Sequence, residues 1–235
     1  MLKSFFRSLL IFVLGILVGF FLNYILFPYF LKFHFSKLPS PAPIYINQTK
    51  EIRIQENTAL KEAIEKVEKT IFAIKTKTQR GKIIEGSGII LTSDGFGITL
   101  NELVPHGGTF EIFVEGEKVK FQILKRDPKT NLALIKFEKK NLKTPPFFNL
   151  ENLKLGERIF LVGTRFDKEL QKEVNEGIIK FFNEDVIETN IFEKEKLAGS
   201  GLFDIEGNLL GINQITPQGQ VISVPVTKIR QFTGF

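Results

Sequence analysis

A β-hairpin is predicted by the run Gly86-Ser87-Gly88-Ile89-Ile90-Leu91-Thr92-Ser93-Asp94-Gly95-Phe96-Gly97-Ile98-Thr99-Leu100-Asn101-Glu102-Leu103-Val104. Its two apolar segments, residues 89–91 and 96–100, have the length of short strands. Ser93-Asp94-Gly95 joins them as a tight turn, because glycine adopts positive φ without a steric cost and aspartate can bond its own backbone. The second strand therefore brings Asn101-Glu102 to its end, where a side chain can reach a cleft.

On both sides of the hairpin the chain continues as short apolar segments separated by turn signals. They lie at residues 70–76, 110–114, 118–124, 131–137, 158–163, 177–182, 186–190, 207–213 and 221–226. No long amphipathic helix interrupts them, so the pattern predicts an all-β domain built as closed antiparallel barrels or as a sandwich. Pro145-Pro146 breaks the pattern, and we expect the boundary between two halves there.

Two elements precede this domain. Asn57 or Thr58 is a suitable cap for a short helix whose apolar residues recur at helical spacing. Those residues are Ala59, Leu60, Ala63, Ile64 and Val67. Before the helix, residues 38–56 are expected to form a linker, and the alternating prolines from Pro39 to Pro43 favour an extended, semi-rigid spacer.

The N-terminal segment is predicted to cross a membrane. Residues 8–31 carry no charge, and a helix of that length reaches about 36 Å, more than a hydrocarbon core of about 30 Å. A cleaved signal peptide is the alternative, but aromatic residues and leucines crowd the end where a cleavage site needs small residues. We therefore expect residues 1–37 to be a cytoplasmic tip and a transmembrane helix that contacts membrane lipid. Gly15 and Gly19 have a spacing suited to helix–helix contact.

The composition excludes several kinds of site. The 235 residues include no cysteine and only two histidines, His34 and His106, so a disulfide, a catalytic thiolate and a multi-histidine metal site are excluded. Nothing in the sequence supports a metal or an organic cofactor. The net charge is +6, and residues 1–37 hold four of these positive charges. In the rest of the chain acids and bases alternate without a basic stripe, which argues against a nucleic-acid partner.

Four further motifs follow the hairpin in order. They are Asp127-Pro128-Lys129-Thr130-Asn131-Leu132-Ala133-Leu134-Ile135, Gly156-Glu157-Arg158-Ile159-Phe160-Leu161-Val162-Gly163, Asn175-Glu176-Gly177-Ile178-Ile179 and Gly207-Asn208-Leu209-Leu210-Gly211-Ile212-Asn213. Together with the hairpin they resemble the HtrA, or Deg-type, family of trypsin-like serine proteases over residues 57–235. The resemblance implies two six-stranded antiparallel β-barrels with a cleft between them, about residues 70–144 and about residues 147–230.

The same resemblance carries expectations about location and assembly. It implies an exported domain, with the N-terminus inside and the trypsin-like domain on the extracytoplasmic side of the cytoplasmic membrane. Members of the family with a membrane anchor form trimers, so a homotrimer is expected here. The family usually continues into PDZ domains that bind the C-termini of other chains. We expect no such domain in this chain.

The catalytic residues of the family are replaced at the positions that match them. The histidine that accepts the serine proton matches Glu102, the aspartate that orients this histidine matches Asn131, and the nucleophilic serine matches Ala198. Lys196 stands at the glycine whose backbone N–H helps to form the oxyanion hole. The resemblance therefore implies that no catalytic residue is left at these positions.

Two other residues are candidates for chemistry at this site. Ser200 in Gly199-Ser200-Gly201 is the alternative nucleophile, although its use would shift the loop by two residues and still leave no histidine at position 102. His106 could swing into the cleft, but a histidine in a loop is more often merely solvated. Glu102 and Asn131 either fill a disused cleft or, with Ser200, bind a peptide end or a basic side chain.

We therefore expect a membrane-anchored, catalytically inactive protease homologue that acts as a protein-binding or scaffold module. Its partner would be a polypeptide or an active protease relative. One alternative is an active serine endopeptidase in protein quality control whose nucleophile is Ser200. The other is a purely structural membrane protein.

Overall fold

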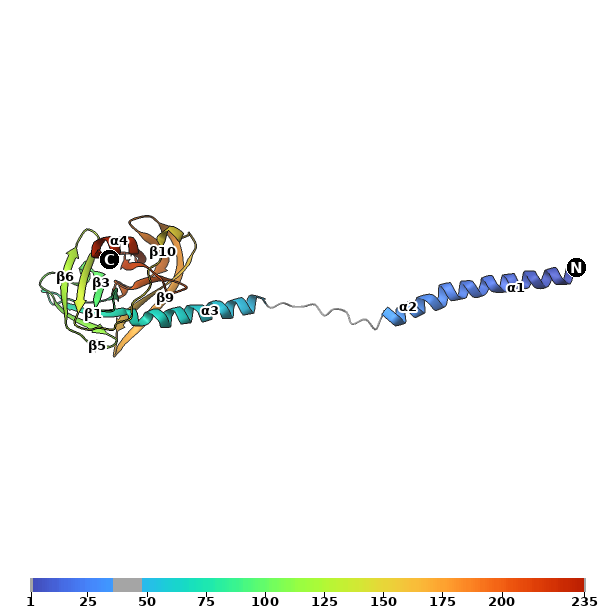
Figure 1. The fold of residues 1–235 in the computed structure, drawn as a ribbon, viewed down its shortest axis with the longest axis horizontal. Helices are drawn as coiled ribbons and strands as arrows, with labels where there is room; N and C mark the ends of the chain where they lie inside the picture. The colour runs from blue at the N-terminus through green and yellow to red at the C-terminus, as the bar shows by residue number, and fades with distance from the viewer. Residues whose placement is uncertain (1, 36–47, 235) are drawn as a thin grey trace. The chain divides into compact units, whose positions relative to one another are not determined.

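The computed structural model describes residues 2–35 and 48–234, coloured along the chain in Figure 1. They fall into two compact units, Met1–Lys50 and Glu51–Phe235. The first unit is helical, and the second holds all the strands of the described chain.

Within the first unit, the described residues 2–35 form one helical run that changes its winding near the end. Its elements are α1 (Leu2–Phe21), a π-helical turn η1 (Leu22–Leu26) and α2 (Phe27–Phe35). In the π turn the Phe27 N–H donates to the Leu22 carbonyl, five residues back. Pro28 follows at once, has no N–H to donate, and in a regular helix would press its ring on the Tyr24 carbonyl. The wider turn is a known way for a helix to accommodate such a residue.

Arg7–Lys32 is the one stretch of the described chain that is long and apolar enough to cross a membrane. It holds 26 residues, all of them exposed, and the predicted span 8–31 lies inside it. At about 1.5 Å per residue the stretch reaches roughly 39 Å, so it can cross a bilayer with some tilt.

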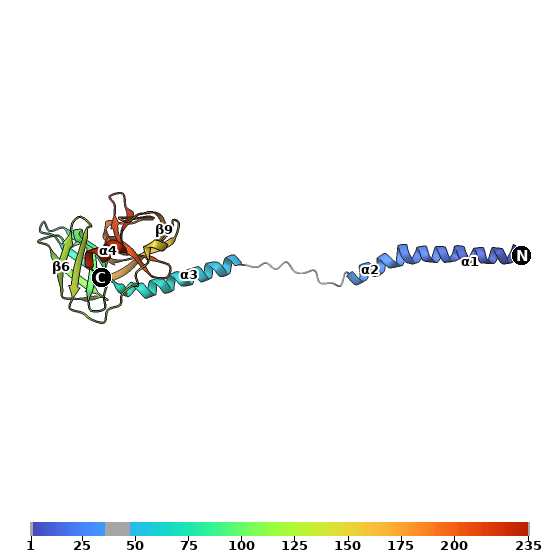
Figure 2. The ribbon, with the colours of Figure 1, turned by 45° about the horizontal axis from the view of Figure 1, so that its top comes forward.

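Helix α3 (Gln48–Val67) leads into the β domain and begins nine residues earlier than we predicted. Residues 48–56, assigned above to the linker, are helical because no proline or glycine interrupts them and Asn57 costs little inside a helix. The rest of the predicted linker, residues 38–47, lies outside the described residues. Ala63 and Val67 are buried against the β domain, and Figures 1 and 2 show the C-terminal end of α3 joining that domain.

The first half of the β domain is a seven-stranded antiparallel sheet in the order β5-β4-β1-β2-β3-β7-β6. Its strands are β1 (Ile71–Lys77), β2 (Ile83–Ile90), β3 (Phe96–Leu100), β4 (Thr109–Val114), β5 (Glu117–Lys118), β6 (Phe121–Asp127) and β7 (Leu132–Phe137). The predicted hairpin is β2–β3, with Gly88 opposite Thr99 and Ile90 opposite Gly97. Gly95 in its turn has a φ of 105°, as the sequence required.

This sheet differs from the closed six-stranded barrel that we expected. The predicted strand 118–124 is divided, because β5 pairs with β4 at one end of the sheet and β6 pairs with β7 at the other. Val119 donates to the Ile112 carbonyl at 2.9 Å, and the Lys120 carbonyl accepts from Glu138 at 3.0 Å. Val119 and Lys120 therefore connect the β5 end of the sheet to the β6 end, but no continuous ladder of hydrogen bonds closes it. The sheet is a half-barrel.

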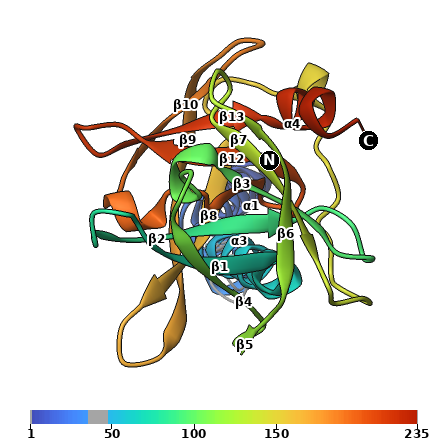
Figure 3. The ribbon, with the colours of Figure 1, turned by 90° about the vertical axis from the view of Figure 1, so that its left-hand side faces the viewer.

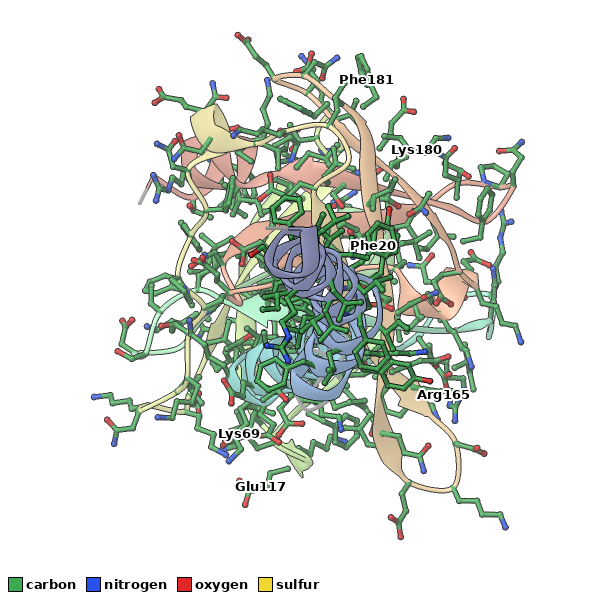
Figure 4. The ribbon with its side chains drawn as sticks, turned by 90° about the vertical axis from the view of Figure 1, so that its right-hand side faces the viewer. Phe20, Lys69, Glu117, Arg165, Lys180 and Phe181 are labelled. Atoms are coloured by element: carbon green, nitrogen blue, oxygen red, sulfur yellow. The ribbon has the colours of Figure 1, made fainter. Side chains whose placement is uncertain are left out.

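The second half is a closed barrel in the order β10-β13-β12-β11-β8-β9. Its strands are β8 (Arg158–Phe166), β9 (Leu170–Phe182), β10 (Ile187–Phe192), β11 (Gly201–Asp204), β12 (Leu209–Ile215) and β13 (Gln220–Pro225), followed by helix α4 (Val226–Thr233). β11 and α4 were not predicted. The β8–β9 hairpin projects beyond the barrel in Figure 3, and Figure 4 labels Arg165 on β8 and Lys180 with Phe181 near the far end of β9. The all-β prediction is confirmed.

One of the three clusters of buried apolar side chains in the described chain is common to the two halves, and it holds them together. The largest cluster of buried apolar side chains takes members from both halves and from α4, among them Ile71, Leu100, Leu132, Phe160, Phe203 and Ile229. Buried polar bonds cross the same boundary. Ser87 donates its N–H to the Ala198 carbonyl at 2.9 Å, and Thr164 donates its N–H to Ser87 Oγ at 2.8 Å. Since such bonds are directional, they fix the position of the loop that carries Ala198.

Candidate functional site

Glu102 lies in a short 3-10 turn, η3 (Asn101–Leu103), directly after strand β3. Two hydrogen bonds join this turn to Asn131. The Asn101 N–H donates to the Asn131 carbonyl at 2.9 Å, and the Glu102 N–H donates to Asn131 Oδ1 at 3.0 Å. The structure therefore brings Glu102 and Asn131 together, as the sequence predicted.

Asn131 owes its position to a turn that the sequence marks clearly. The residue adopts a left-handed φ of 57°, which asparagine tolerates better than most residues. Before it, Lys129 N–H and Thr130 Oγ1 both donate to the carboxylate of Asp127. These bonds, with that from Thr130 the strongest, lower the pKa of Asp127, so the carboxylate stays charged and holds the turn at neutral pH. Leu132 then begins β7 beside β3.

Ala198 follows a second 3-10 turn, η5 (Glu195–Leu197). In this turn the Leu197 N–H donates to the Lys194 carbonyl at 2.9 Å, and the Ala198 N–H donates to the Glu195 carbonyl at 3.0 Å. A backbone N–H bonded inside its own turn has no hydrogen left for a substrate oxygen. The Ala198 N–H therefore points into its own turn.

Glu102 and Ala198 open onto one pocket of about 720 Å³. Its wall is formed by Ile84, Glu102, Leu103, Glu193, Lys194, Glu195, Ala198, Ile215, Thr216, Pro217, Gln218 and Gly219. The pocket lies where the half-barrel meets the barrel, because the first three of these residues belong to the former and the rest to the latter. Its volume is in the range of pockets that take a small molecule or a side chain.

Ser200 and His106 do not belong to this pocket. Ser200 is fully buried, and its Oγ accepts a hydrogen bond of 2.9 Å from Asn213 Nδ2. Ser223 Oγ donates in turn to Asn213 Oδ1. His106 is exposed in the loop after η3. The structure thus joins Glu102 to Asn131 by a hydrogen bond and places Glu102 and Ala198 on one pocket, which neither Ser200 nor His106 lines.

Several residues of the pocket were missed by the sequence reading. Glu193 and Glu195 belong to an alternating charge run, Glu193-Lys194-Glu195-Lys196, that looks like an ordinary solvated loop. Residues 216–219 form the turn between β12 and β13, and Pro217 and Gly219 mark it as a turn and nothing more. Their role depends on the curvature of the barrel, which brings both loops to the same rim.

Comparison with known proteins agrees with this geometry. A family model described as a trypsin-like peptidase domain matches residues 86–212, more than half of the chain. A probable periplasmic serine endoprotease, DegP-like, of Chlamydia pneumoniae is 29% identical over 155 residues, 62% of this chain and 31% of that protein. A protein of the same description from Halomonas elongata is 31% identical over 139 residues, 54% of this chain and 28% of that protein. The chain spans about three tenths of the length of these curated relatives.

Among solved structures, the HtrA-type protease AlgW, determined with a tripeptide, has a similar fold. The TM-score is 0.67 at 22% sequence identity, and the match covers 74% of this chain and 62% of that chain. The fold predicted from the motifs is confirmed by this likeness.

Proposed function

Because the chain belongs to the trypsin-like peptidase domain family and is similar to DegP-like, HtrA-type serine proteases, we propose that it is a catalytically inactive member that binds polypeptides without cutting them. The observation that carries the proposal is the bond from the Ala198 N–H to the Glu195 carbonyl. It supports inactivity because an N–H that is bonded within its own turn is not free to stabilise a substrate oxyanion.

The side chains around the pocket support the same proposal. Ala198 offers no nucleophile, and a glutamate carboxylate is a weaker base than the histidine imidazole that this step requires. Asn131 is uncharged and cannot stabilise an imidazolium. A protease of this kind needs all these groups together, so the three replacements act against the same step.

Ser200 is a poor substitute for the missing nucleophile. Its Oγ is bonded to Asn213 in the protein interior, and neither residue lines the pocket. An attacking oxygen must lie within reach of the scissile carbonyl and of a base. The burial of Ser200 therefore favours a structural role.

We place the protein on the outer side of the cytoplasmic membrane. The stretch Arg7–Lys32 supplies an anchor of sufficient length, and the matched relatives carry the word periplasmic in their names. The proposal includes two expectations about partners. The domain binds polypeptides, and it assembles with an active relative or as a homotrimer. The domain would then present its pocket to exported chains.

The proposal is tested by a fluorophosphonate probe and by unfolded casein, each incubated with the purified full chain and with Ser200→Ala. We expect no labelling and no cleavage by either protein. Labelling that disappears in Ser200→Ala would contradict the proposal and identify a rebuilt site. Labelling that persists in that variant would also contradict it, since another serine must then be activated.

A further inference from the structure

The pocket carries an excess of carboxylates. Glu102, Glu193 and Glu195 line it, against one cation, Lys194. The neighbouring hollow of about 430 Å³ shares Ile84 and Glu195 with it but has a balanced lining. Its other charged residues are Lys82, Glu85 and Lys196. The negative charge is therefore local to the pocket and is not a property of the whole surface.

Glu102 is presented to the pocket on a fixed backbone. Its N–H is bonded to Asn131 Oδ1 at 3.0 Å, and β3 and β7 are paired just before it, with Leu100 opposite Leu132. Its carboxylate is exposed and accepts no hydrogen bond or ion pair from residues 2–35 and 48–234. A carboxylate held this way loses little conformational entropy of the backbone when it meets a cation.

Glu193 is held in a second way. Its Oε1 accepts a hydrogen bond of 2.6 Å from Asn175 Nδ2 on β9, and its N–H donates to the Gly219 carbonyl at 2.7 Å. The residue is only partly exposed, so its charge is screened less than that of a free surface glutamate. Two glutamates of different loops thus line one pocket, Glu102 on a fixed backbone and Glu193 with its carboxylate held by Asn175.

The chemistry of the wall favours an extended organic cation. Leu103, Ala198, Ile215 and Pro217 give the pocket apolar surface beside its carboxylates. A lysine or arginine side chain has this combination, since its hydrocarbon stem packs on apolar surface and its head is charged. The carboxylates do not gather as a metal site would require, because no group of three metal-ligating side chains occurs in the described part of the chain.

We propose that this pocket seats a lysine or arginine side chain of a bound polypeptide, with the charged head against Glu102 and Glu193. The inference rests on the proposed function and names the kind of sequence that the inactive domain recognises. Glu102 then has a binding role at the position where the family carries a proton acceptor.

The test measures binding of a fluorescent peptide to the full chain in mild detergent. The probe is dye-labelled Ala-Ala-Arg-Ala-Ala with an amidated C-terminus, and its matched control has citrulline, the neutral isostere, in place of arginine. We expect the arginine peptide to bind on the order of tenfold more tightly, which corresponds to about 1.4 kcal/mol. Glu102→Gln should abolish most of this ratio, and added salt should reduce it.

A matched variant separates the local effect from a general change of charge. Glu169 is exposed in the β8–β9 loop, away from the pocket, so Glu169→Gln should leave the ratio between the two peptides unchanged. The thermal midpoint of each variant shows that it is folded. Equal binding of both peptides, no binding of either, or an unchanged ratio in Glu102→Gln would each overturn the inference.

Failure of the proposed function would look different. Mass spectrometry of the same samples detects cleavage of the peptides, and cleavage would overturn catalytic inactivity. The ratio between arginine and citrulline would still measure the charge preference of the pocket. Intact peptides with no preference would leave the inactive binding domain in place and reject the cationic ligand.

Discussion

Asn131 has a structural task in the turn before β7. Its Oδ1 accepts a hydrogen bond from the Glu102 N–H, and this bond ties the turn after β3 to the turn before β7. The sequence predicted this neighbourhood, because the hairpin and the turn at Asp127 each determine where a strand ends. It did not predict the bond from the Ala198 N–H to the Glu195 carbonyl. Both groups belong to the backbone, so many different side chains are compatible with this bond.

The burial of Ser200 leads to a prediction about stability. Ser200→Ala should destabilise the domain by about 1–3 kcal/mol, because Asn213 Nδ2 would lose its acceptor in the protein interior. Ser93 is exposed in the hairpin turn, and Ser93→Ala should change stability by less than about 0.5 kcal/mol. Urea denaturation followed by circular dichroism measures both. Equal values would mean that the Ser200 hydroxyl is dispensable.

The 3-10 turn before Ala198 predicts how activity could be restored. The triple variant Glu102→His, Asn131→Asp, Ala198→Ser should stay unlabelled by fluorophosphonate, because the N–H of residue 198 remains bonded to Glu195. Adding Lys196→Gly should raise labelling at least on the order of tenfold, since glycine permits the backbone rotation that frees this N–H.

The matched control for this restoration keeps Ala198 and carries the other three changes. It has no nucleophile at that position and should stay unlabelled. If the triple variant labels as strongly as the fourfold variant, the turn is not what blocks the site.

At the scale of the elements, the sequence predicted strands better than helix ends. Repeating apolar segments with clear turns gave the hairpin and most of the barrel. Gly201–Asp204 was missed because four residues offer no periodicity, and α4 was missed because its apolar residues Val226, Ile229 and Phe232 continue directly from a strand. The division of the predicted strand 118–124 at Val119 could not be predicted. It depends on the pairing of β5 with β4 and of β6 with β7, which the sequence of the segment does not determine.

The β8–β9 hairpin reaches the half-barrel through Lys172, whose Nζ donates to the Ile71 carbonyl at 2.6 Å. Burial lowers the pKa of Lys172 to about 8, although the negative charges of Glu68 and Glu115 act to raise it. An unfolded lysine has a pKa near 10.4, so between about pH 8 and pH 10.4 the unfolded chain binds more protons than the folded one. The contribution of Lys172 to stability should therefore rise with pH across this window.

The contribution of Lys172 to stability is isolated by comparing the free energy of unfolding of the natural chain with that of a variant that lacks the amine. The free energy of unfolding of the natural chain relative to Lys172→Met should increase from pH 7.5 to pH 10, because all other groups titrate alike in both proteins. A difference that stays flat or falls would show that the amine is not desolvated in the folded state.

At the scale of the whole molecule, the anchor and the β domain are expected to act as separate parts. The buried apolar clusters of the β domain take all their described members from residues 60–232, so the domain has a core of its own. A fragment that begins at Gln48 should be soluble and should melt at the same temperature as the full chain in detergent. The full chain should remain with the membrane fraction after an alkaline wash.

This prediction is checked by cell fractionation and by thermal denaturation of the two proteins. A lower melting temperature of the fragment would mean that the N-terminal segment stabilises the domain. Release of the full chain by alkali would contradict a transmembrane anchor.

The turn from Glu195 to Ala198 also has an evolutionary consequence. A serine at position 198 alone would gain nothing for selection to favour, because the backbone around it and the residue at 102 would still be wrong for catalysis. A histidine at 102 alone would lose the carboxylate and return no activity. Under the proposed function each of these single substitutions leaves the domain inactive, so at least two must be present together before selection can favour activity.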